Sequence, residues 1–114
     1  MRFREGTLDA YIWDSVVDYN EYKLPESING VVVDIGAHIG SFSYACYERG
    51  APVILAFEPL RSNFEVLQEN LKDTHVQMFN TAVWRSDRYT DVLYHTGESV
   101  MPDGSLNTGG GNIL

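Results

Sequence analysis

Two carboxylates and two glycines are spaced as in a site that binds a nucleoside. Asp34 interrupts a run of apolar residues near its carboxyl end, Gly36 and Gly40 follow it, and Glu58 lies about 20 residues past the glycine turn. A carboxylate at that distance from a glycine turn can accept hydrogen bonds from both hydroxyl groups of a ribose. Glycines also let a ligand approach the backbone at the start of a helix. The alternative at this point is an ordinary strand, turn and helix with a solvated Glu58.

The spacing of the glycines argues against a nicotinamide site. A dinucleotide fingerprint needs G-x-G-x-x-G, whereas His38 stands two residues after Gly36 and Ser41 occupies the third site. The pattern present is D-x-G-x-x-x-G, which resembles the first motif of S-adenosylmethionine-dependent methyltransferases. A nicotinamide-dependent oxidoreductase is therefore only a distant third interpretation.

Strands and helices alternate around these residues. Apolar runs over 31–35 and 53–57 predict buried strands, and 75–79 predicts a shorter third one. A first helix should end at Gly50, and a second should begin with a capping box over 62–65. Right-handed crossovers then place three parallel strands in the order 3-2-1. The first strand would lie at the edge although its sequence is that of a central strand, so we expect something to pair with it.

The segments that flank this α/β core differ from it in composition. Asp9 is expected to cap a short helix over 10–18, and 90–94 alternates enough for a fourth strand. The expected organisation is an N-terminal extension or lid over 1–30, a cofactor-binding core over 31–95 and a Gly-rich loop or tail over 96–114.

Composition narrows the classes of partner. The chain has 114 residues with 8 Lys and Arg against 16 Asp and Glu, a net charge of −8. This charge disfavours nucleic acid or an anionic membrane surface as the main partner. The single Cys46 excludes an internal disulfide and a cysteine-based metal site, and we expect it to be buried and inert. No stretch approaches the ~20 apolar residues of a membrane span, and we expect a cytoplasmic protein without a metal.

Several motifs together resemble the FkbM family of S-adenosylmethionine-dependent methyltransferases, in order and over nearly the whole chain. The matching core segments are 33–43, 56–59, 63–71 and 80–84, and residues 3–9 and 20–22 resemble the family's N-terminal extension. The resemblance implies a Rossmann-like methyltransferase fold with S-adenosylmethionine as the cofactor. It also implies methylation of a hydroxyl group on a sugar or natural product. Because the family continues through further strands, we expect an incomplete domain whose activity alone is uncertain.

The resemblance also implies which residues bind the cofactor. The glycine turn would contact its methionine part, Glu58 its ribose, and residues after the second and third strands its adenine. The expected set is Asp34, Gly36, Ala37, His38, Gly40, Glu58, Pro59, Leu60, Thr81 and Ala82.

The catalytic group is less well defined. His38 is a weak candidate for the general base that an alcohol acceptor needs, although a residue in such a turn more often has no proton role. His95 and Glu21 are weaker candidates. We expect a small-molecule acceptor, and a second copy or a partner chain to complete the sheet. The alternative function is a non-catalytic nucleoside-binding or interaction module that a partner chain completes.

Overall fold

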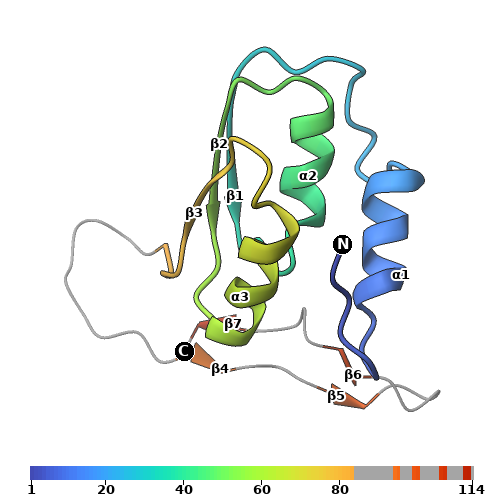
Figure 1. The fold of residues 1–114 in the computed structure, drawn as a ribbon, viewed down its shortest axis with the longest axis vertical. Helices are drawn as coiled ribbons and strands as arrows, with labels where there is room; N and C mark the ends of the chain where they lie inside the picture. The colour runs from blue at the N-terminus through green and yellow to red at the C-terminus, as the bar shows by residue number, and fades with distance from the viewer. Residues whose placement is uncertain (84–93, 96–98, 101–105, 108–111, 114) are drawn as a thin grey trace.

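Three parallel strands form the centre of the fold. The computed structural model describes residues 1–83, 94–95, 99–100, 106–107 and 112–113. The strands β1 (Val31–Ile35), β2 (Val53–Phe57) and β3 (Gln77–Phe79) lie in the order β1-β2-β3 (Figure 1). The predicted order 3-2-1 is therefore confirmed, and β1 lies at the edge of this sheet. The register pairs Ile35 with Phe57 and Phe57 with Phe79, so the carboxyl ends of the strands are level.

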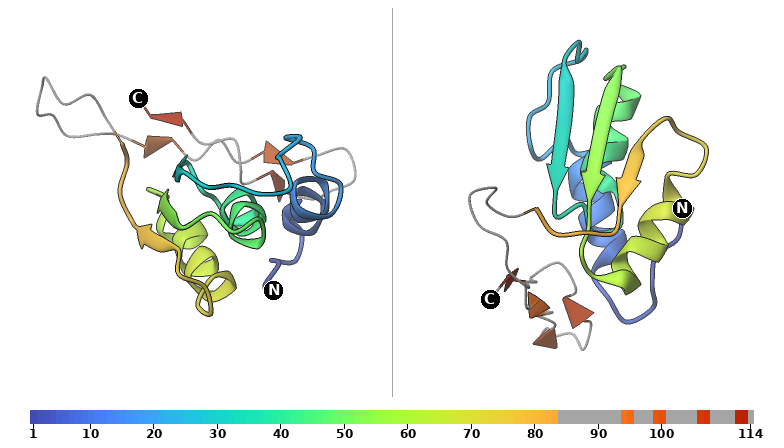
Figure 2. Two further views of the ribbon diagram at one scale, coloured as in Figure 1. Left: turned by 90° about the horizontal axis from the view of Figure 1, so that it is seen from above. Right: turned by 90° about the vertical axis from the view of Figure 1, so that its left-hand side faces the viewer.

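Two helices cover one face of the sheet. Helix α2 (Ser41–Glu48) and helix α3 (Arg61–Asn70) lie on the same side of the strands (Figure 2). Leu67 and Leu71 pack there against Ile54 and Ala56 of β2, and all four side chains are fully buried. Helix α2 is followed by Gly50 with φ +80°, as its predicted role at the helix end requires. The buried Cys46 belongs to this core, and burial raises the pKa of its thiol to about 11.

The other face of β1 is open. Val31, Val33 and Ile35 are 65%, 52% and 63% exposed, whereas Asp34 between them is buried. Successive side chains of a strand point to opposite faces, so all three apolar residues lie on the face that carries no helix. The right-hand view of Figure 2 shows the strands from this side, with the helices behind them. The apolar sequence of β1 is thus only half covered.

The N-terminal extension contains the predicted helix. Helix α1 (Asp9–Trp13) continues as one turn of π-helix, η1 (Asp14–Asp18), and packs beside α2 (Figure 1). Trp13 and Val17 pack with Ile39 of the glycine turn in a second, smaller core. This packing attaches the extension to the residues that follow β1.

Both predicted N-terminal caps are wrong. Leu8, without a side-chain cap, precedes α1, and the buried Asp9 instead turns toward Arg4. Helix α3 likewise begins after Leu60. The predicted capping box over 62–65 therefore lies inside the helix, and Arg61 and Glu65 form an exposed ion pair. At α1 the predicted cap residue thus bonds Arg4, and at α3 the helix begins before the predicted cap.

Short antiparallel pairs occur near the carboxyl end of the chain. Strand β4 (Tyr94–His95) pairs with β7 (Asn112–Ile113), and β5 (Ser99–Val100) pairs with β6 (Leu106–Asn107). The glycine content predicts a loop or tail here and does not anticipate these pairs. Most of the predicted strand over 90–94 lies outside the described residues.

Gly40 is required by two independent constraints. Its φ is +98°, in the left-handed region that disfavours a side chain. A Cβ at this position would also lie 2.9 Å from Leu67 Cδ1 and 3.0 Å from Leu71 Cδ1. The absence of a side chain therefore lets the start of α2 pack closely on α3.

We predict that Gly40→Ala lowers the free energy of unfolding by about 2–5 kcal/mol, from backbone strain and crowding together. Gly30→Ala is the control, because a Cβ at Gly30 has no neighbour within 4 Å. Its effect should stay within about 0.5 kcal/mol. Urea unfolding of the two variants measures the difference. Equal unfolding midpoints would contradict the packing role of Gly40.

Candidate nucleoside-binding site

A pocket of about 560 Å³ lies beside the carboxyl end of β1. One wall comes from β1 and the turn that follows it, and includes Asp34, Gly36 and Ala37. The other wall comes from the N-terminal extension, and includes Glu21 and Tyr22. Ligands of open α/β sheets bind at this end of the strands. The expected lid is therefore a wall of the pocket.

The predicted cofactor residues fall into two groups. Asp34, Gly36, Ala37 and His38 line the pocket, together with Ser41 at the start of α2. The other six are not among its lining residues, and their contact with a cofactor stays a prediction. Gly40 and Glu58 are buried, Pro59, Leu60 and Ala82 are half-buried, and Thr81 is exposed.

The backbone amides of the glycine turn are used within the protein. Gly36 and Ala37 both donate to the carbonyl oxygen of Phe57, at 2.8 and 2.9 Å, and Gly40 donates to Ala37. These bonds attach the turn to the end of β2 and keep its shape. These N–H groups are therefore not available to a ligand. A ligand can still approach the backbone at Gly36, where a Cβ would have no neighbour within 4 Å.

Asp34 is held by the helix that follows the turn. Its Oδ2 accepts a hydrogen bond of 2.7 Å from Ser43 Oγ, and its side chain is almost completely buried. Burial raises the pKa of Asp34, with the hydrogen bond from Ser43 opposing this effect and the charge of Glu58 adding to it. The carboxyl group thus occupies a fixed position at the floor of the pocket.

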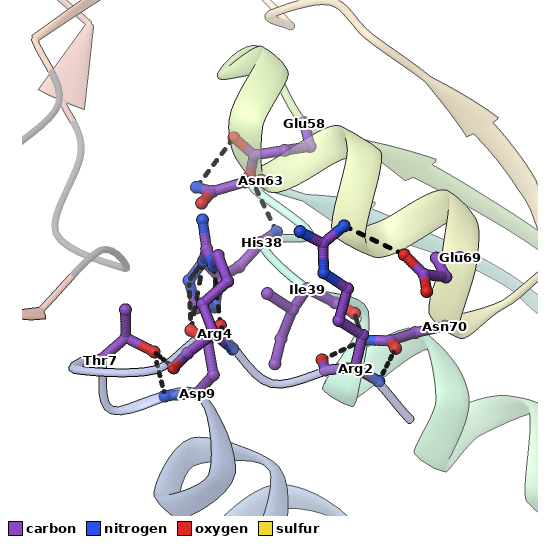
Figure 3. Close-up of polar contacts among 10 residues, drawn as sticks. All are labelled: Arg2, Arg4, Thr7, Asp9, His38, Ile39, Glu58, Asn63, Glu69 and Asn70. Carbon is purple, nitrogen blue, oxygen red and sulfur yellow. Dashed lines mark hydrogen bonds and ion pairs between the residues drawn. The ribbon is translucent and has the colours of Figure 1, made fainter.

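Glu58 joins the two turns at the carboxyl ends of β1 and β2. Its Oε1 accepts the backbone N–H of His38 at 2.8 Å, and its Oε2 accepts that of Leu60 at 2.9 Å. Asn63 Nδ2 lies 3.5 Å from Oε2 (Figure 3). The residue is only 2% exposed. Both oxygens already accept protein hydrogen bonds, so a ribose would need their remaining lone pairs, and the ribose role stays a prediction.

His38 faces the N-terminal extension. Its Nε2 lies 3.3 Å from Arg4 Nη2 and 3.7 Å from Asp9 Oδ1 (Figure 3). Burial lowers the pKa of His38 to about 4, so the ring is neutral at pH 7. Arginine can only donate, so Nε2 is the accepting nitrogen and Nδ1 carries the proton. An Nε2 lone pair directed at Arg4 supports a positioning role, and the catalytic role of His38 stays a prediction.

Arg4 and Asp9 form a buried pair that completes this contact. Arg4 Nε and its backbone N–H donate to Asp9 Oδ2 at 2.8 and 3.1 Å, and Nη2 donates to Oδ1 at 3.2 Å. Burial raises the pKa of Asp9, but the hydrogen bonds and charge of Arg4 outweigh it, so the net pKa lies below its ordinary value. The Asp9 carboxylate therefore stays ionised in a fully buried position.

Asn70 makes a second attachment between the extension and the turn. Its Nδ2 donates to the carbonyl oxygens of Ile39 and Arg2, at 3.0 and 3.2 Å, and its Oδ1 accepts the Arg2 N–H at 2.5 Å (Figure 3). One amide at the end of α3 thus binds both segments. The extension is fixed to the turn at two places, through Arg4 and through Asn70.

Sequence reasoning assigned no role to four residues of this network. They are Arg4, Ser43, Asn63 and Asn70. Only Ser43 had a local signal, because a hydroxyl one turn into a helix can reach back to the preceding strand end. The partners of Arg4 and Asn70 include residues 34 and 68 positions away, which no local pattern shows.

The part of the chain that the structure describes has neither a metal cluster nor a membrane-spanning helix. No three His, Cys, Asp or Glu side chains gather there as a metal site would need. No helix within the same residues has the length and apolar character to span a membrane.

Solved structures similar to this chain include phosphoethanolamine N-methyltransferase 1 from Haemonchus contortus, in complex with phosphoethanolamine and S-adenosylhomocysteine. The identity is 28% and the TM-score 0.52, over 62% of this chain and 15% of that protein. An S-adenosylmethionine-dependent methyltransferase from Leishmania major shares 21% identity with a TM-score of 0.49, over 68% of this chain and 35% of its own. No family model matches the chain, and no curated protein does.

The likeness to the Haemonchus contortus enzyme agrees with the arrangement of strands and helices described above. The fold is the predicted α/β fold, Rossmann-like and of the methyltransferase type. The chain spans only 15% and 35% of the lengths of the two enzymes.

We predict that Glu58→Gln destabilises the protein by about 1–3 kcal/mol, because an amide cannot accept from both His38 and Leu60 and places a donor against one of them. Glu65→Gln is the control, since its side chain is 59% exposed. Its effect should stay within about 0.5 kcal/mol. Thermal and urea unfolding measure both variants. A Glu58→Gln protein as stable as the control would show that the two turns are joined by other contacts.

Proposed function

We propose that the chain is the cofactor-binding part of an S-adenosylmethionine-dependent methyltransferase. The observation that carries the proposal is the pocket where Asp34 and Gly36 meet the N-terminal extension. It lies at the carboxyl end of a parallel strand, the usual ligand position in this architecture. Its volume of about 560 Å³ suits a ligand of nucleoside size.

The finer proposal is membership of the FkbM family, with transfer of the methyl group to a hydroxyl oxygen. It is supported by the motif residues 33–43 and 56–59, and by an N-terminal extension that forms a wall of the pocket. When bound, S-adenosylmethionine supplies a methyl group on a positively charged sulfur. The acceptor is a small molecule, for which a sugar or natural product is the proposed class.

The described residues would orient the cofactor and exclude water. Gly36 leaves room for close approach, while Asp34 presents a carboxyl group that Ser43 holds in place. Ile12 and Phe42 add apolar surface to the same pocket. Methyl transfer needs alignment of the acceptor with the sulfur–carbon bond, in a site that excludes water. A rigid turn with internally bonded amides suits that requirement.

Activity and location are also proposals. A neutral imidazole at His38 could accept a proton from an alcohol if the ring left Arg4, and this is the proposed but weak route to a general base. The chain spans a small part of its structural neighbours, so we propose that a full active site needs more protein than these residues. We place the protein in the cytoplasm, where a free thiol such as Cys46 is common.

We predict that S-adenosylhomocysteine binds the wild-type chain and that Gly36→Ala weakens this binding by about tenfold or more, because a Cβ would enter the pocket. Gly50→Ala is a matched control. The two glycines have φ of +79° and +80°, and a Cβ at either has no neighbour within 4 Å. Backbone strain is therefore the same, but only Gly36 lines the pocket.

Isothermal titration calorimetry measures both variants. Binding that survives in Gly50→Ala and falls in Gly36→Ala supports the site. Absence of binding to the wild type, or equal losses in the two variants, would contradict it.

The exposed face of β1 favours a second candidate function. We propose as the alternative a non-catalytic module that binds a nucleoside and whose sheet a second copy completes. Val31, Val33 and Ile35 are each more than half exposed on one edge strand. Apolar edge strands of this kind promote pairing with another chain.

This alternative predicts a dimer in solution, because pairing along β1 would give its open edge a neighbouring strand. Val31→Lys should return the dimer to a monomer, since a charge on an edge strand opposes pairing and Val31 is not among the residues that line the pocket. Tyr19→Lys is the control, because Tyr19 is 82% exposed and belongs to another segment. Sedimentation analysis measures the masses. A monomeric wild type, or a dimer that persists in Val31→Lys, would contradict pairing through β1.

A further inference from the structure

We infer that Glu21 and Tyr22 of the N-terminal extension form a binding site for the positively charged part of the ligand in the pocket. The inference rests on the proposed function and assigns a new role to the extension. In this role the extension binds a cation, in addition to covering the sheet. Neither residue belongs to the glycine turn.

The backbone that carries these two residues is held firmly. The Glu21 N–H donates to the carbonyl oxygen of Ser15 at 3.0 Å. Asn20 then closes a turn, because its Oδ1 accepts the Leu24 N–H at 2.8 Å and its Nδ2 donates to the Leu24 carbonyl at 3.1 Å. Asn20 itself has φ +49°, a conformation that asparagine tolerates better than most residues. The backbone of Glu21 and Tyr22 is therefore fixed at the pocket wall, and both side chains are exposed there.

Tyr22 is also placed by an aromatic neighbour. Its ring meets Phe42 of α2 edge to face, with centroids 5.3 Å apart and planes at 82°. Both residues line the pocket. Aromatic faces attract cations at exposed sites as well as buried ones, and Tyr22 is 58% exposed.

The charges around the pocket point to a cation. Its lining residues include the acids Glu21 and Asp34 but no lysine or arginine. His38, the one histidine among them, is neutral at pH 7 because burial lowers its pKa to about 4. The backbone N–H groups of Gly36 and Ala37 donate to the carbonyl oxygen of Phe57 and are not available to a ligand. A pocket with carboxyl groups, aromatic rings and few free donors suits a positively charged ligand better than a phosphate.

Two groups of the proposed cofactor carry such a charge. S-adenosylmethionine has a sulfonium and an α-ammonium group, S-adenosylhomocysteine keeps only the ammonium, and adenosine has neither. The three compounds therefore separate the two sources of positive charge without altering the nucleoside. Binding of each is measured by isothermal titration calorimetry.

Glu21→Gln should weaken S-adenosylmethionine binding by about three- to tenfold and leave adenosine unchanged, because only a charged ligand loses an attraction. Tyr22→Leu should weaken S-adenosylmethionine binding by about threefold and leave adenosine unchanged, because only a charged ligand loses its attraction to the ring. The controls are Glu26→Gln and Tyr19→Leu, which remove an exposed acid and an exposed ring outside the pocket.

Each outcome decides the question. A loss confined to S-adenosylmethionine assigns the site to the sulfonium, and an equal loss for S-adenosylhomocysteine assigns it to the ammonium; both support the inference. Unchanged binding of all three ligands, or an equal loss that includes adenosine, overturns it while the proposed function stands. A wild-type chain that binds none of the three contradicts the proposed function itself.

Discussion

The buried carboxylate of Glu58 is the interaction on which the described fold most depends. One oxygen accepts the N–H of His38 and the other that of Leu60, so a single side chain sets the distance between the turn after β1 and the start of α3. A carboxylate is needed because only two acceptor oxygens satisfy two converging donors. Without this carboxylate, the backbone N–H groups of His38 and Leu60 would lose their hydrogen-bond acceptor at a site from which water is nearly excluded. The position of the pocket wall follows from this constraint.

The N-terminal extension depends on the same turn. The backbone N–H of His38 donates to Glu58, and its ring accepts a hydrogen bond from Arg4. Arg4 in turn forms an ion pair with the buried Asp9. Asn70 bonds both the turn and the extension, so the extension, the turn and α3 form one connected polar network. Such networks hold a unique geometry when every member is satisfied. In this fold Glu21, Tyr22 and Asp34 line the same pocket.

Local sequence patterns predict the strands and helices of the core but not where the helices begin. The runs at 31–35 and 53–57 are strands with the predicted bounds, because β-branched and apolar residues report burial directly. The predicted caps at Asp9 and at 62–65 are wrong: Asp9 bonds Arg4, and α3 begins at Arg61. Four of the predicted cofactor residues, Asp34, Gly36, Ala37 and His38, line the pocket, and their contact with a cofactor stays a prediction. Its second wall comes from a segment whose packing depends on Trp13, and no spacing rule shows that packing.

We propose that a nucleoside cofactor binds between the glycine turn and the N-terminal extension. Amide chemical shifts of the ¹⁵N-labelled chain, followed during titration with S-adenosylhomocysteine, test this most directly. We expect the largest changes at Gly36, Ala37 and Phe42 on one wall and at Tyr22 on the other. A spectrum that does not change, or changes confined to the far end of α3 around Glu69, would contradict it.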